Sequence, residues 1–447
     1  MGIAASYALP FPRETVWEWH ARPGAVTRLT PGFLPMQVTQ EARSLRNGVT
    51  TFSLPAGQKW VAQHDDTFYI PGTQFVDYAA NQPLKAATNW RHTHRFEDSG
   101  EGTLLIDDVR ANLPEPILRP AWAYRQRQLL DDLSFIDSLP ETEQLVVAMT
   151  GSSGLVGTHL RAQLTTAGHH VIQLVRGEAG PGQRHWDMDN PAADLLEGVD
   201  AVVHIAGESI MGRFTEEKKR KIEQSRVEPT RKLATLAADS GVRTFVSASA
   251  VGYYGTDAGE RKHVESDGPG DGFLAEVCAK WEEASHAGAR DGSQHDMRVV
   301  NIRTGLTLSS AGGLLPVLKA SVATGMSARF GGGDFWMSWI ALDDLTDMYM
   351  RALVDESVTG PINATAPNPV TNDDMSATLA RLMHRPDFLS IPRFGPKLIL
   401  GAEGAQELAL ANQRVVPAEA ESRGWNFRYP TLEAALRHEL GREELLG

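Results

Sequence analysis

Hydrophobic and polar residues alternate along much of the first 140 residues, as in the run from Trp90 to Phe96. A period of two places the aromatic side chains of such a run on one face of a strand. From Pro120 to Leu139, by contrast, apolar residues recur near helical spacing with charged residues between them. The pattern predicts a mainly β domain over residues 1–140 that closes with a long amphipathic helix.

After a polar linker at Pro140–Glu143, short apolar runs alternate with helical stretches. Near-continuous apolar strands separated by helices are typical of a parallel sheet that is covered on both faces. The sequence therefore predicts an α/β fold with a Rossmann-type doubly wound parallel sheet over residues 143–385. Its strands are expected at Gln144–Thr150, His170–Arg176, Ala201–Gly207, Arg243–Ala250 and Arg298–Leu308.

The last part of the chain, residues 386–447, is rich in proline and arginine and then carries helical patterns at Gly404–Gln413 and Leu432–Leu440. We expect it to form a small helical domain that packs on the Rossmann domain.

Composition excludes several classes of protein. Hydrophobic residues make up 42% of the chain and charged residues 22%, as in ordinary globular proteins. With 56 acidic and 43 basic residues the net charge is −13, which disfavours nucleic acid and anionic membranes as partners. The single cysteine, Cys278, fits a reducing compartment, and no apolar run approaches the roughly 20 residues of a membrane-spanning helix. We therefore expect a cytoplasmic protein.

A glycine-rich turn joins the first strand of the second domain to a helix at His159–Ala167. In such a turn Gly151 allows a tight bend, Gly154 lets the backbone approach a pyrophosphate, and Gly157 lets helix and strand pack closely. The helix N-terminus then offers free N–H groups to phosphates. The alternative is a purely structural turn. The predicted dinucleotide site comprises Gly151, Ser152, Ser153, Gly154, Leu155, Val156 and Gly157.

The end of the second strand bears on the choice of cofactor. An acidic residue there would bind the ribose hydroxyls of NAD, whereas an arginine accommodates the 2′-phosphate of NADP. This chain has Arg176 at that place. The sequence favours NADP(H), with NAD and a solvated loop arginine as the alternative.

Several segments resemble the extended branch of the short-chain dehydrogenase/reductase superfamily, and one subgroup in it that is labelled nucleoside-diphosphate-sugar epimerase. They are the loop from Thr150 to Gly157, Ala206-Gly207-Glu208, Ser225-Arg226-Val227, Ser247 to Gly255, Arg303-Thr304-Gly305, Gly360 to Pro369, and Gln413 to Phe427. By this resemblance Ala206 and Gly207 border the cofactor. The segment from Trp17 to Ala25, with the closing helix, resembles a START-related, polyketide-cyclase-like helix-grip domain.

Members of this superfamily use a serine that orients the substrate oxygen, a tyrosine that exchanges its proton, and a lysine four residues after the tyrosine. Ser249 and Lys280 match the serine and the lysine, but the residue four before Lys280 is Glu276. The predicted catalytic residues are Ser249, Glu276 and Lys280. Ser249 as a strand-end cap, Glu276 on an exposed helix face and Cys278 as a thiol near the cofactor stay open alternatives.

A glycine-rich loop from Gly331 to Trp336 either forms a lid over the substrate or is a plain surface loop. In the first domain His92 and His94 share one face of a strand, as metal ligands would, but the sequence shows no third ligand, so no metal is expected.

Two functions fit these features. The first is an NADP(H)-dependent oxidoreductase or epimerase-like enzyme that acts on a small carbonyl, alcohol or nucleotide-sugar substrate, with an N-terminal domain that binds an apolar ligand. The second is a catalytically weak NADP(H)-binding regulatory or sensor protein, because the usual catalytic tyrosine is not found.

Overall fold

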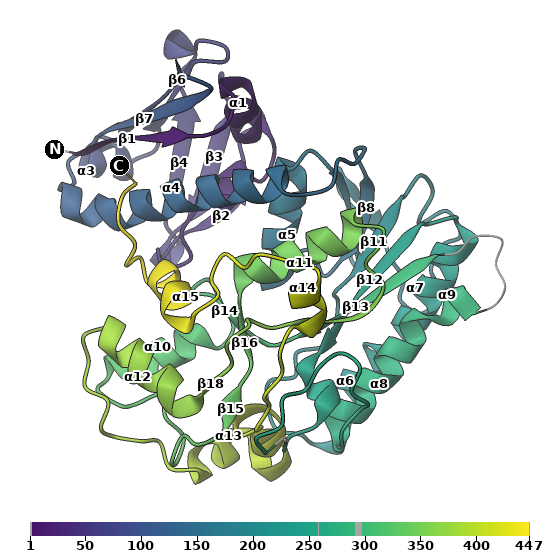
Figure 1. The fold of residues 1–447 in the computed structure, drawn as a ribbon. Helices are drawn as coiled ribbons and strands as arrows, with labels where there is room; N and C mark the ends of the chain where they lie inside the picture. Colours follow the sequence, from purple (N-terminus) through teal and green to yellow (C-terminus); the bar gives the residue numbers. More distant parts are fainter. Residues whose placement is uncertain (1, 258, 291–296, 447) are drawn as a thin grey trace. The chain divides into compact units, whose positions relative to one another are not determined.

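The computed structural model describes residues 2–257, 259–290 and 297–446 and divides the chain into two compact units (Figure 1). Unit 1 comprises Met1–Leu139, Arg161–Gly168 and Arg437–Gly447, and unit 2 comprises Pro140–Leu160 and His169–Leu436. Among the described residues no helix combines the length and hydrophobicity needed to cross a membrane.

Unit 1 is built on an antiparallel seven-stranded sheet in the order β1-β7-β6-β5-β4-β3-β2, with a long helix, α4, packed on it (Figure 1). Its elements are β1 (Gly2–Leu9), α1 (Arg13–Ala21), α2 (Ala25–Arg28), β2 (Gln37–Gln40), β3 (Val49–Ser53), η1 (Pro55–Gly57), β4 (Lys59–His64), η2 (Asp66–Phe68), β5 (Gln74–Ala79), α3 (Leu84–Thr88), β6 (Arg91–Ser99), β7 (Gly102–Arg110) and α4 (Glu115–Asp137).

The predicted alternation holds in this sheet, since buried and more exposed residues alternate along β7. Leu129 and Leu133 of α4 join Phe96 and Leu105 of the sheet in one buried cluster. The predicted start of the helix at Pro120 is wrong. Helix α4 begins five residues earlier, at Glu115, with a proline in its first turn, and continues through Pro120.

Unit 2 contains a seven-stranded sheet in the order β10-β9-β8-β11-β12-β13-β17, and every neighbouring pair is parallel. The predicted Rossmann-like α/β fold is confirmed. Strand order reverses between β8 and β11, where open α/β sheets bind their ligands at the carboxyl ends of the strands. The strands are β8 (Val146–Thr150), β9 (His170–Val175), β10 (Gln183–His185), β11 (Ala201–His204), β12 (Thr244–Ala250), β13 (Arg298–Thr304) and β17 (Gly360–Ala364).

Helices cover this sheet on both faces. Helices α7 and α8 lie side by side on one face, while α11 packs on the other (Figure 1). The remaining elements are α5 (Leu155–Thr166), α6 (Glu216–Gln224), α7 (Val227–Asp239), η3 (Val251–Tyr254), α8 (Phe273–Ser285), α9 (Ala287–Arg290), β14 (Leu306–Leu308), α10 (Leu315–Ala323), β15 (Trp336–Met337), β16 (Trp339–Ala341), α11 (Leu342–Val354), β18 (Val370–Thr371), α12 (Asn372–Leu382), α13 (Phe394–Gly404), η4 (Ala405–Ala409), α14 (Ala418–Ser422) and α15 (Leu432–Glu439).

Several predicted elements differ from the structure. Helix α5 begins at Leu155, four residues before the predicted start at His159, and β11 ends at His204, three residues before the predicted end at Gly207. The apolar run Arg298–Leu308 is split at Gly305, where an added Cβ would lie 2.7 Å from the Ser338 carbonyl oxygen. The chain therefore leaves the large sheet there, and β14 pairs with β16 in a separate two-stranded sheet. The helix predicted at Gly404–Gln413 is instead α13 followed by the π-helical turn η4.

Candidate functional site

The glycine-rich turn lies directly between β8 and α5, at the carboxyl edge of the sheet. Gly151 has a φ of 66°, and a Cβ on it would lie 2.9 Å from the Ala206 backbone nitrogen. A Cβ on Gly157 would lie 2.2 Å from the Gly151 carbonyl oxygen, whereas Gly154 is less crowded, at 3.3 Å from the same atom. Only glycine fits at Gly151 and Gly157 without movement of the backbone.

The solvent-facing side of this turn is formed mainly by backbone atoms. Ser152 is buried and its hydroxyl donates to Gln173 Oε1 at 3.1 Å, while Ser153 and Gly154 are exposed. Leu155 and Val156 are half-buried in the first turn of α5. The exposed turn and the N-terminus of a twelve-residue helix together form an anion-binding arrangement of backbone N–H groups.

Thr150 and His204 hold the ends of β8 and β11 together. Thr150 Oγ1 accepts hydrogen bonds from the backbone N–H groups of Ile205 and Ala206, at 3.1 and 3.2 Å. Its own hydrogen therefore points to His204 Nδ1, 2.8 Å away. Burial, reinforced by the charge of Arg226, lowers the pKa of His204 to about 3, so this ring stays neutral and accepts that bond.

Two arginines lie near this edge of the sheet. Arg176 follows the last residue of β9 directly and is exposed, and it forms no ion pair with any described residue. Arg226 lies against the segment after β11, since a Cβ on Gly207 would be 2.9 Å from its guanidinium carbon. It also stacks on the ring of Trp281 at 5.1 Å. Arg176 is therefore the more accessible of the two, because Arg226 is half-buried and donates to the Ile222 carbonyl oxygen at 3.2 Å.

Ser249, near the end of β12, is buried and forms a short hydrogen bond across to α8. Its hydroxyl donates to Glu282 Oε1 at 2.6 Å. Arg303 of β13 binds both oxygens of Glu282, each at 2.8 Å, and its side chain is 3% exposed. Burial opposes the charge of Arg303, but the paired Glu282 holds its pKa above the ordinary value. Ser249 is thus fixed by a buried ion pair.

This network continues toward η3. Arg303 Nη1 donates to the hydroxyl of Tyr254 at 2.8 Å, and Tyr254 donates in turn to Asn363 Oδ1 at 2.7 Å. Burial raises the pKa of Tyr254 to about 12, so it remains a phenol at neutral pH. The guanidinium also lies 3.6 Å from the ring centre of Tyr253. Tyr254 therefore links Arg303 to Asn363, whereas Tyr253 contacts the network only through its ring.

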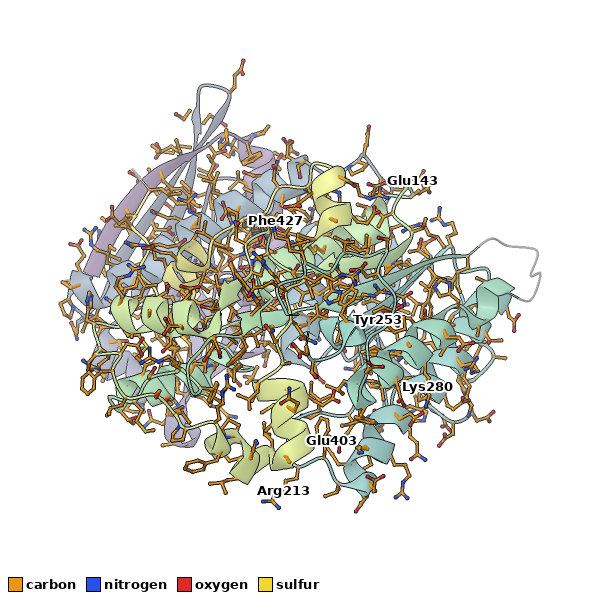
Figure 2. The ribbon with its side chains drawn as sticks, turned by 60° about the horizontal axis from the view of Figure 1, so that its bottom comes forward. Glu143, Arg213, Tyr253, Lys280, Glu403 and Phe427 are labelled. Carbon is orange, nitrogen blue, oxygen red and sulfur yellow. The ribbon has the colours of Figure 1, made fainter. Side chains whose placement is uncertain are left out.

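The structure does not bring Glu276 and Lys280 to Ser249. Both are exposed on the outer face of α8, and Lys280, labelled in Figure 2, pairs with Glu223 of α6 at 2.7 Å. Lys280 donates to Glu223 of α6, and Glu282 rather than Glu276 binds Ser249. The catalytic roles of Glu276 and Lys280 stay predictions.

Cys278 lies on the inner face of α8 with Glu282, one helical turn away. Burial, followed by the nearby Glu282 carboxylate, raises the pKa of the thiol to about 12. It is therefore uncharged at neutral pH, which does not favour a nucleophilic role.

Sequence reasoning missed Glu282 and the role of Arg303. The signal was present in α8, because Leu274, Cys278 and Glu282 are spaced by four residues and share one face of a helix. A charged residue that continues an apolar face is a candidate for a buried ion pair. The four-residue spacing of Glu276 and Lys280 defines another face, which is the exposed one.

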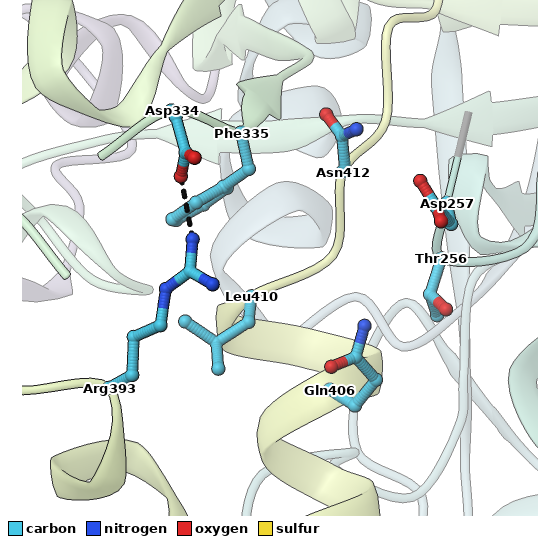
Figure 3. A pocket seen from close by; sticks show the side chains of 8 residues that line it. All are labelled: Thr256, Asp257, Asp334, Phe335, Arg393, Gln406, Leu410 and Asn412. Carbon is cyan, nitrogen blue, oxygen red and sulfur yellow. Dashed lines mark hydrogen bonds and ion pairs between the residues drawn. The ribbon is translucent and has the colours of Figure 1, made fainter. Parts of the chain in front are cut away.

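A pocket of about 240 Å³ lies in unit 2 beside the glycine-rich loop before β15 (Figure 3). Asp334 of this loop and Arg393 form an ion pair of 2.6 Å at its rim. Asn412 accepts a hydrogen bond from the Trp336 backbone N–H at 2.8 Å. The pocket is lined by Thr256, Asp257, Asp334, Phe335, Arg393, Gln406, Leu410 and Asn412. It is thus rich in hydrogen-bonding groups and is formed partly by the predicted C-terminal domain.

Comparisons with known proteins agree with this geometry. The model of the NAD dependent epimerase/dehydratase family matches residues 147–364, and a domain of unknown function, DUF1731, matches residues 391–439. The epimerase family protein Mb2239 of Mycobacterium bovis is 39% identical over 295 residues, which are 65% of this chain and 96% of that protein.

Two solved structures are similar as well. The nucleoside-diphosphate sugar epimerase from Corynebacterium glutamicum is 48% identical with a TM-score of 0.88, covering 99% of this chain and 91% of that chain. The human epimerase family protein SDR39U1, solved with NADPH, is 27% identical with a TM-score of 0.59, covering 66% of this chain and 99% of that chain. The chain therefore belongs to the NAD-dependent epimerase/dehydratase family.

Proposed function

We propose that this protein is an NADP(H)-dependent oxidoreductase or epimerase-like enzyme that acts on a small carbonyl, alcohol or nucleotide-sugar substrate. The observation that carries the proposal is that backbone atoms leave no room for a Cβ at Gly151 or Gly157. The resulting glycine turn exposes its backbone at the point where the strand order reverses. Such a turn is shaped for a dinucleotide pyrophosphate.

The residues at this edge fit the cofactor. The backbone from Gly151 to Gly157 and the start of α5 would bind the pyrophosphate, and Ala206 and Gly207 would border the dinucleotide from β11. Arg176 would pair with the 2′-phosphate, which gives the preference for NADP(H). The human relative solved with NADPH supports this choice. When bound, the nicotinamide supplies or accepts the hydride.

Ser249 is the group that we assign to the substrate oxygen. A carbonyl oxygen that becomes an alcohol gains a proton when its carbon gains a hydride. The Ser249 hydroxyl, whose single hydrogen points to Glu282 in this structure, would turn to donate a hydrogen bond to that oxygen and orient it, while the proton itself would come from water. The pocket at Asp257, Asp334 and Asn412 offers the amide and carboxylate groups that bind a hydroxyl-rich substrate. The relative from Corynebacterium glutamicum, a nucleoside-diphosphate sugar epimerase, supports this substrate class.

Unit 1 is proposed to bind an apolar ligand, in keeping with its resemblance to START-related domains. A long helix packed on an antiparallel sheet supports this, as does the contact of Trp17 in α1 with Phe75 and Phe96 of the sheet.

A second candidate, a regulatory or sensor protein that binds NADP(H) without efficient turnover, is favoured by one observation. Lys280 is half exposed and is paired with Glu223, so it is not placed to lower the pKa of a tyrosine beside Ser249.

Oxidation of NADPH by the purified protein with a panel of nucleotide sugars and small carbonyl compounds tests the two candidates. Stoichiometric oxidation supports the enzyme, and Ser249→Ala is then expected to lower turnover by about 10²–10⁴-fold. Glu276→Gln and Lys280→Met test the assignment made from sequence. Saturable NADPH binding with neither oxidation of NADPH nor conversion of any nucleotide sugar to its epimer favours the sensor, because an epimerase regenerates its cofactor in each turnover.

A further inference from the structure

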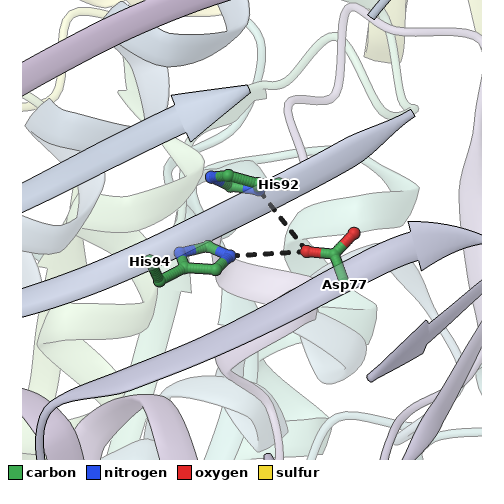
Figure 4. Close-up of side chains that lie close together, drawn as sticks. All are labelled: Asp77, His92 and His94. Atoms are coloured by element: carbon green, nitrogen blue, oxygen red, sulfur yellow. Dashed lines mark ion pairs between the residues drawn. The ribbon is translucent and has the colours of Figure 1, made fainter. Parts of the chain in front are cut away.

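Four titratable side chains meet on one face of the sheet in unit 1. Asp77 of β5 stands opposite His92 of β6, and His94 of β6 stands opposite Asp107 of β7. Because the side-chain period of a strand is two, His92 and His94 point to the same face. That face is turned toward α4, since the ring of His92 contacts Trp122. Figure 4 shows the Asp77 carboxylate facing both imidazole rings.

The distances from Asp77 to the two rings suit a metal ion better than hydrogen bonds. Asp77 Oδ2 lies 3.5 Å from His92 Nδ1 and 3.5 Å from His94 Nε2 (Figure 4). Ordinary hydrogen bonds of this kind are about 2.7–3.2 Å long. Zinc binds nitrogen and oxygen at about 2.0–2.2 Å with tetrahedral geometry, which separates its ligand atoms by about 3.3–3.5 Å. Together the three groups offer such a set of ligand atoms.

The surroundings orient each of these groups. Trp90 Nε1 donates to Asp77 Oδ1 at 3.1 Å, which leaves Oδ2 facing the histidines. His92 Nε2 donates to Asp107 Oδ1 at 2.8 Å, so its Nδ1 is left with a lone pair toward Asp77. A carboxylate that holds the far nitrogen of a metal-binding histidine is a frequent feature of zinc sites.

His94 is held mainly by packing. Its ring stacks on Phe75 with centres 4.1 Å apart. Its Nδ1 lies 3.0 Å from Asp107 Oδ1 but is buried without a hydrogen-bond partner among the described residues. The other ring nitrogen, Nε2, is 3.5 Å from Asp77 Oδ2, and a metal ion between these two atoms would give both of them a ligand bond.

Charge points the same way. The side chains of Asp77 and Asp107 are 13% and 4% exposed, and those of the two histidines are each 5% exposed. Within the described part of the chain, no lysine or arginine forms an ion pair with either carboxylate. The two buried carboxylates therefore have only the two histidines as ion-pair partners among the described residues, and a divalent cation would neutralise both of them.

We propose that Asp77, His92 and His94 bind a divalent transition-metal ion, best matched by zinc, with Asp107 positioning His92. Two nitrogen ligands and one oxygen ligand suit zinc and its neighbours rather than calcium or magnesium. Three protein ligands leave one coordination position for water or for an oxygen-bearing ligand of unit 1.

The test uses the full-length protein, stripped of metal by a chelator and titrated with Zn²⁺ in a calorimeter and with Co²⁺ by absorption spectroscopy. We expect one ion per chain, a tetrahedral Co²⁺ spectrum, and a rise in the melting temperature with Zn²⁺. Asp77→Asn, which keeps the size of the side chain, should weaken binding by at least about 100-fold, and Asp107→Asn by about 10–100-fold.

His185→Asn is the matched control, because His185 lies in unit 2 and should leave the affinity unchanged. Circular dichroism of the metal-free variants shows whether they fold. The proposal is overturned if the wild-type protein binds no stoichiometric ion, or if folded Asp77→Asn binds Zn²⁺ as tightly as the wild type. The four side chains would then form a metal-free network of histidines and carboxylates.

Discussion

At the scale of single residues, the cofactor edge of unit 2 combines groups with separate roles. Gly151 and Gly157 give the backbone its path, because a Cβ at either position would meet backbone atoms. His204 accepts a hydrogen bond from Thr150, which in turn accepts hydrogen bonds from two backbone N–H groups directly after β11. Arg176 is exposed at the end of β9, so its role depends on a ligand rather than on the fold. These roles can be tested one side chain at a time.

Arg176→Ala is expected to weaken NADPH binding by roughly tenfold or more and to leave NADH binding nearly unchanged. A charge-assisted contact between arginine and phosphate contributes about 1.5–3 kcal/mol, and only NADPH carries the 2′-phosphate. Calorimetric titration with both cofactors measures the difference. Arg231→Ala, a change at an exposed arginine of α7, is the control. Equal losses for both cofactors would show that Arg176 does not bind the 2′-phosphate.

His204 is expected to make the protein less stable in acid. Its folded-state pKa of about 3 lies below the ordinary value of 6.5, so it contributes nothing to pH dependence well above pH 6.5. As the pH falls from 6.5 toward 3, the unfolded chain binds a proton that the folded chain does not. The free energy of unfolding then falls by up to about 1.4 kcal/mol per pH unit.

His204→Asn removes this titration and keeps an acceptor for Thr150. Urea unfolding of both proteins at several pH values isolates the contribution of His204 from that of the other histidines. We expect the wild type to lose more stability than the variant between pH 6.5 and pH 4. Parallel curves would mean that His204 takes up its proton in the folded state.

At the scale of elements, most strands of the parallel sheet were predicted correctly from the sequence. The buried face of a helix was harder to predict. Strands β8, β9, β11, β12 and β13 follow apolar runs, whose length and spacing are local properties, whereas the polar edge strand β10 was not predicted. Helix α8 was also predicted, but its register was taken from the spacing of a family motif. The contact of Ser249 with Glu282 is a tertiary one, and no local pattern near Ser249 encodes it.

The two faces of α8 predict different effects for two similar substitutions. Glu282→Gln breaks a buried ion pair with Arg303 and should lower the free energy of unfolding by about 3–5 kcal/mol. Glu276→Gln changes an exposed side chain and should alter it by less than about 0.5 kcal/mol. Denaturant unfolding with an unchanged slope measures both values. The reverse order would contradict the assignment of the buried face.

The same limit applies to the cluster in unit 1. Alternation placed His92 and His94 on one face. Asp77 lies fifteen residues before His92 in the sequence and comes next to it only because β5 pairs with β6. A third ligand of this kind becomes visible when the register of β5 and β6 is known.

At the scale of the whole molecule, the chain consists of an N-terminal part and a part that matches the epimerase/dehydratase family. The match to the relative from Mycobacterium bovis covers 65% of this chain and 96% of that protein. That relative therefore contains the part of the chain that matches the family, here called the family unit, and has no counterpart of the remaining third. The human relative shows the same, since 99% of it is covered by 66% of this chain. The family unit is therefore a folding unit in other proteins.

A fragment that starts at Glu143 and runs to the end of the chain is expected to fold and to bind NADPH. It contains the complete sheet of unit 2 and the glycine-rich turn. Energy transfer from tryptophan to bound NADPH gives its affinity, and circular dichroism shows whether it is folded. A folded fragment without saturable binding would show that the site needs residues of the first 142.

The measurement that tests the central claim most directly is a calorimetric titration of the full-length protein with NADPH and, separately, with NADH. The open turn between Gly151 and Gly157 predicts one dinucleotide per chain, and Arg176 predicts that NADPH binds at least about tenfold more tightly than NADH. If neither cofactor binds saturably, the turn is a structural one and the proposed activity is wrong. If NADH binds as tightly as NADPH, the assigned preference for NADP(H) is contradicted.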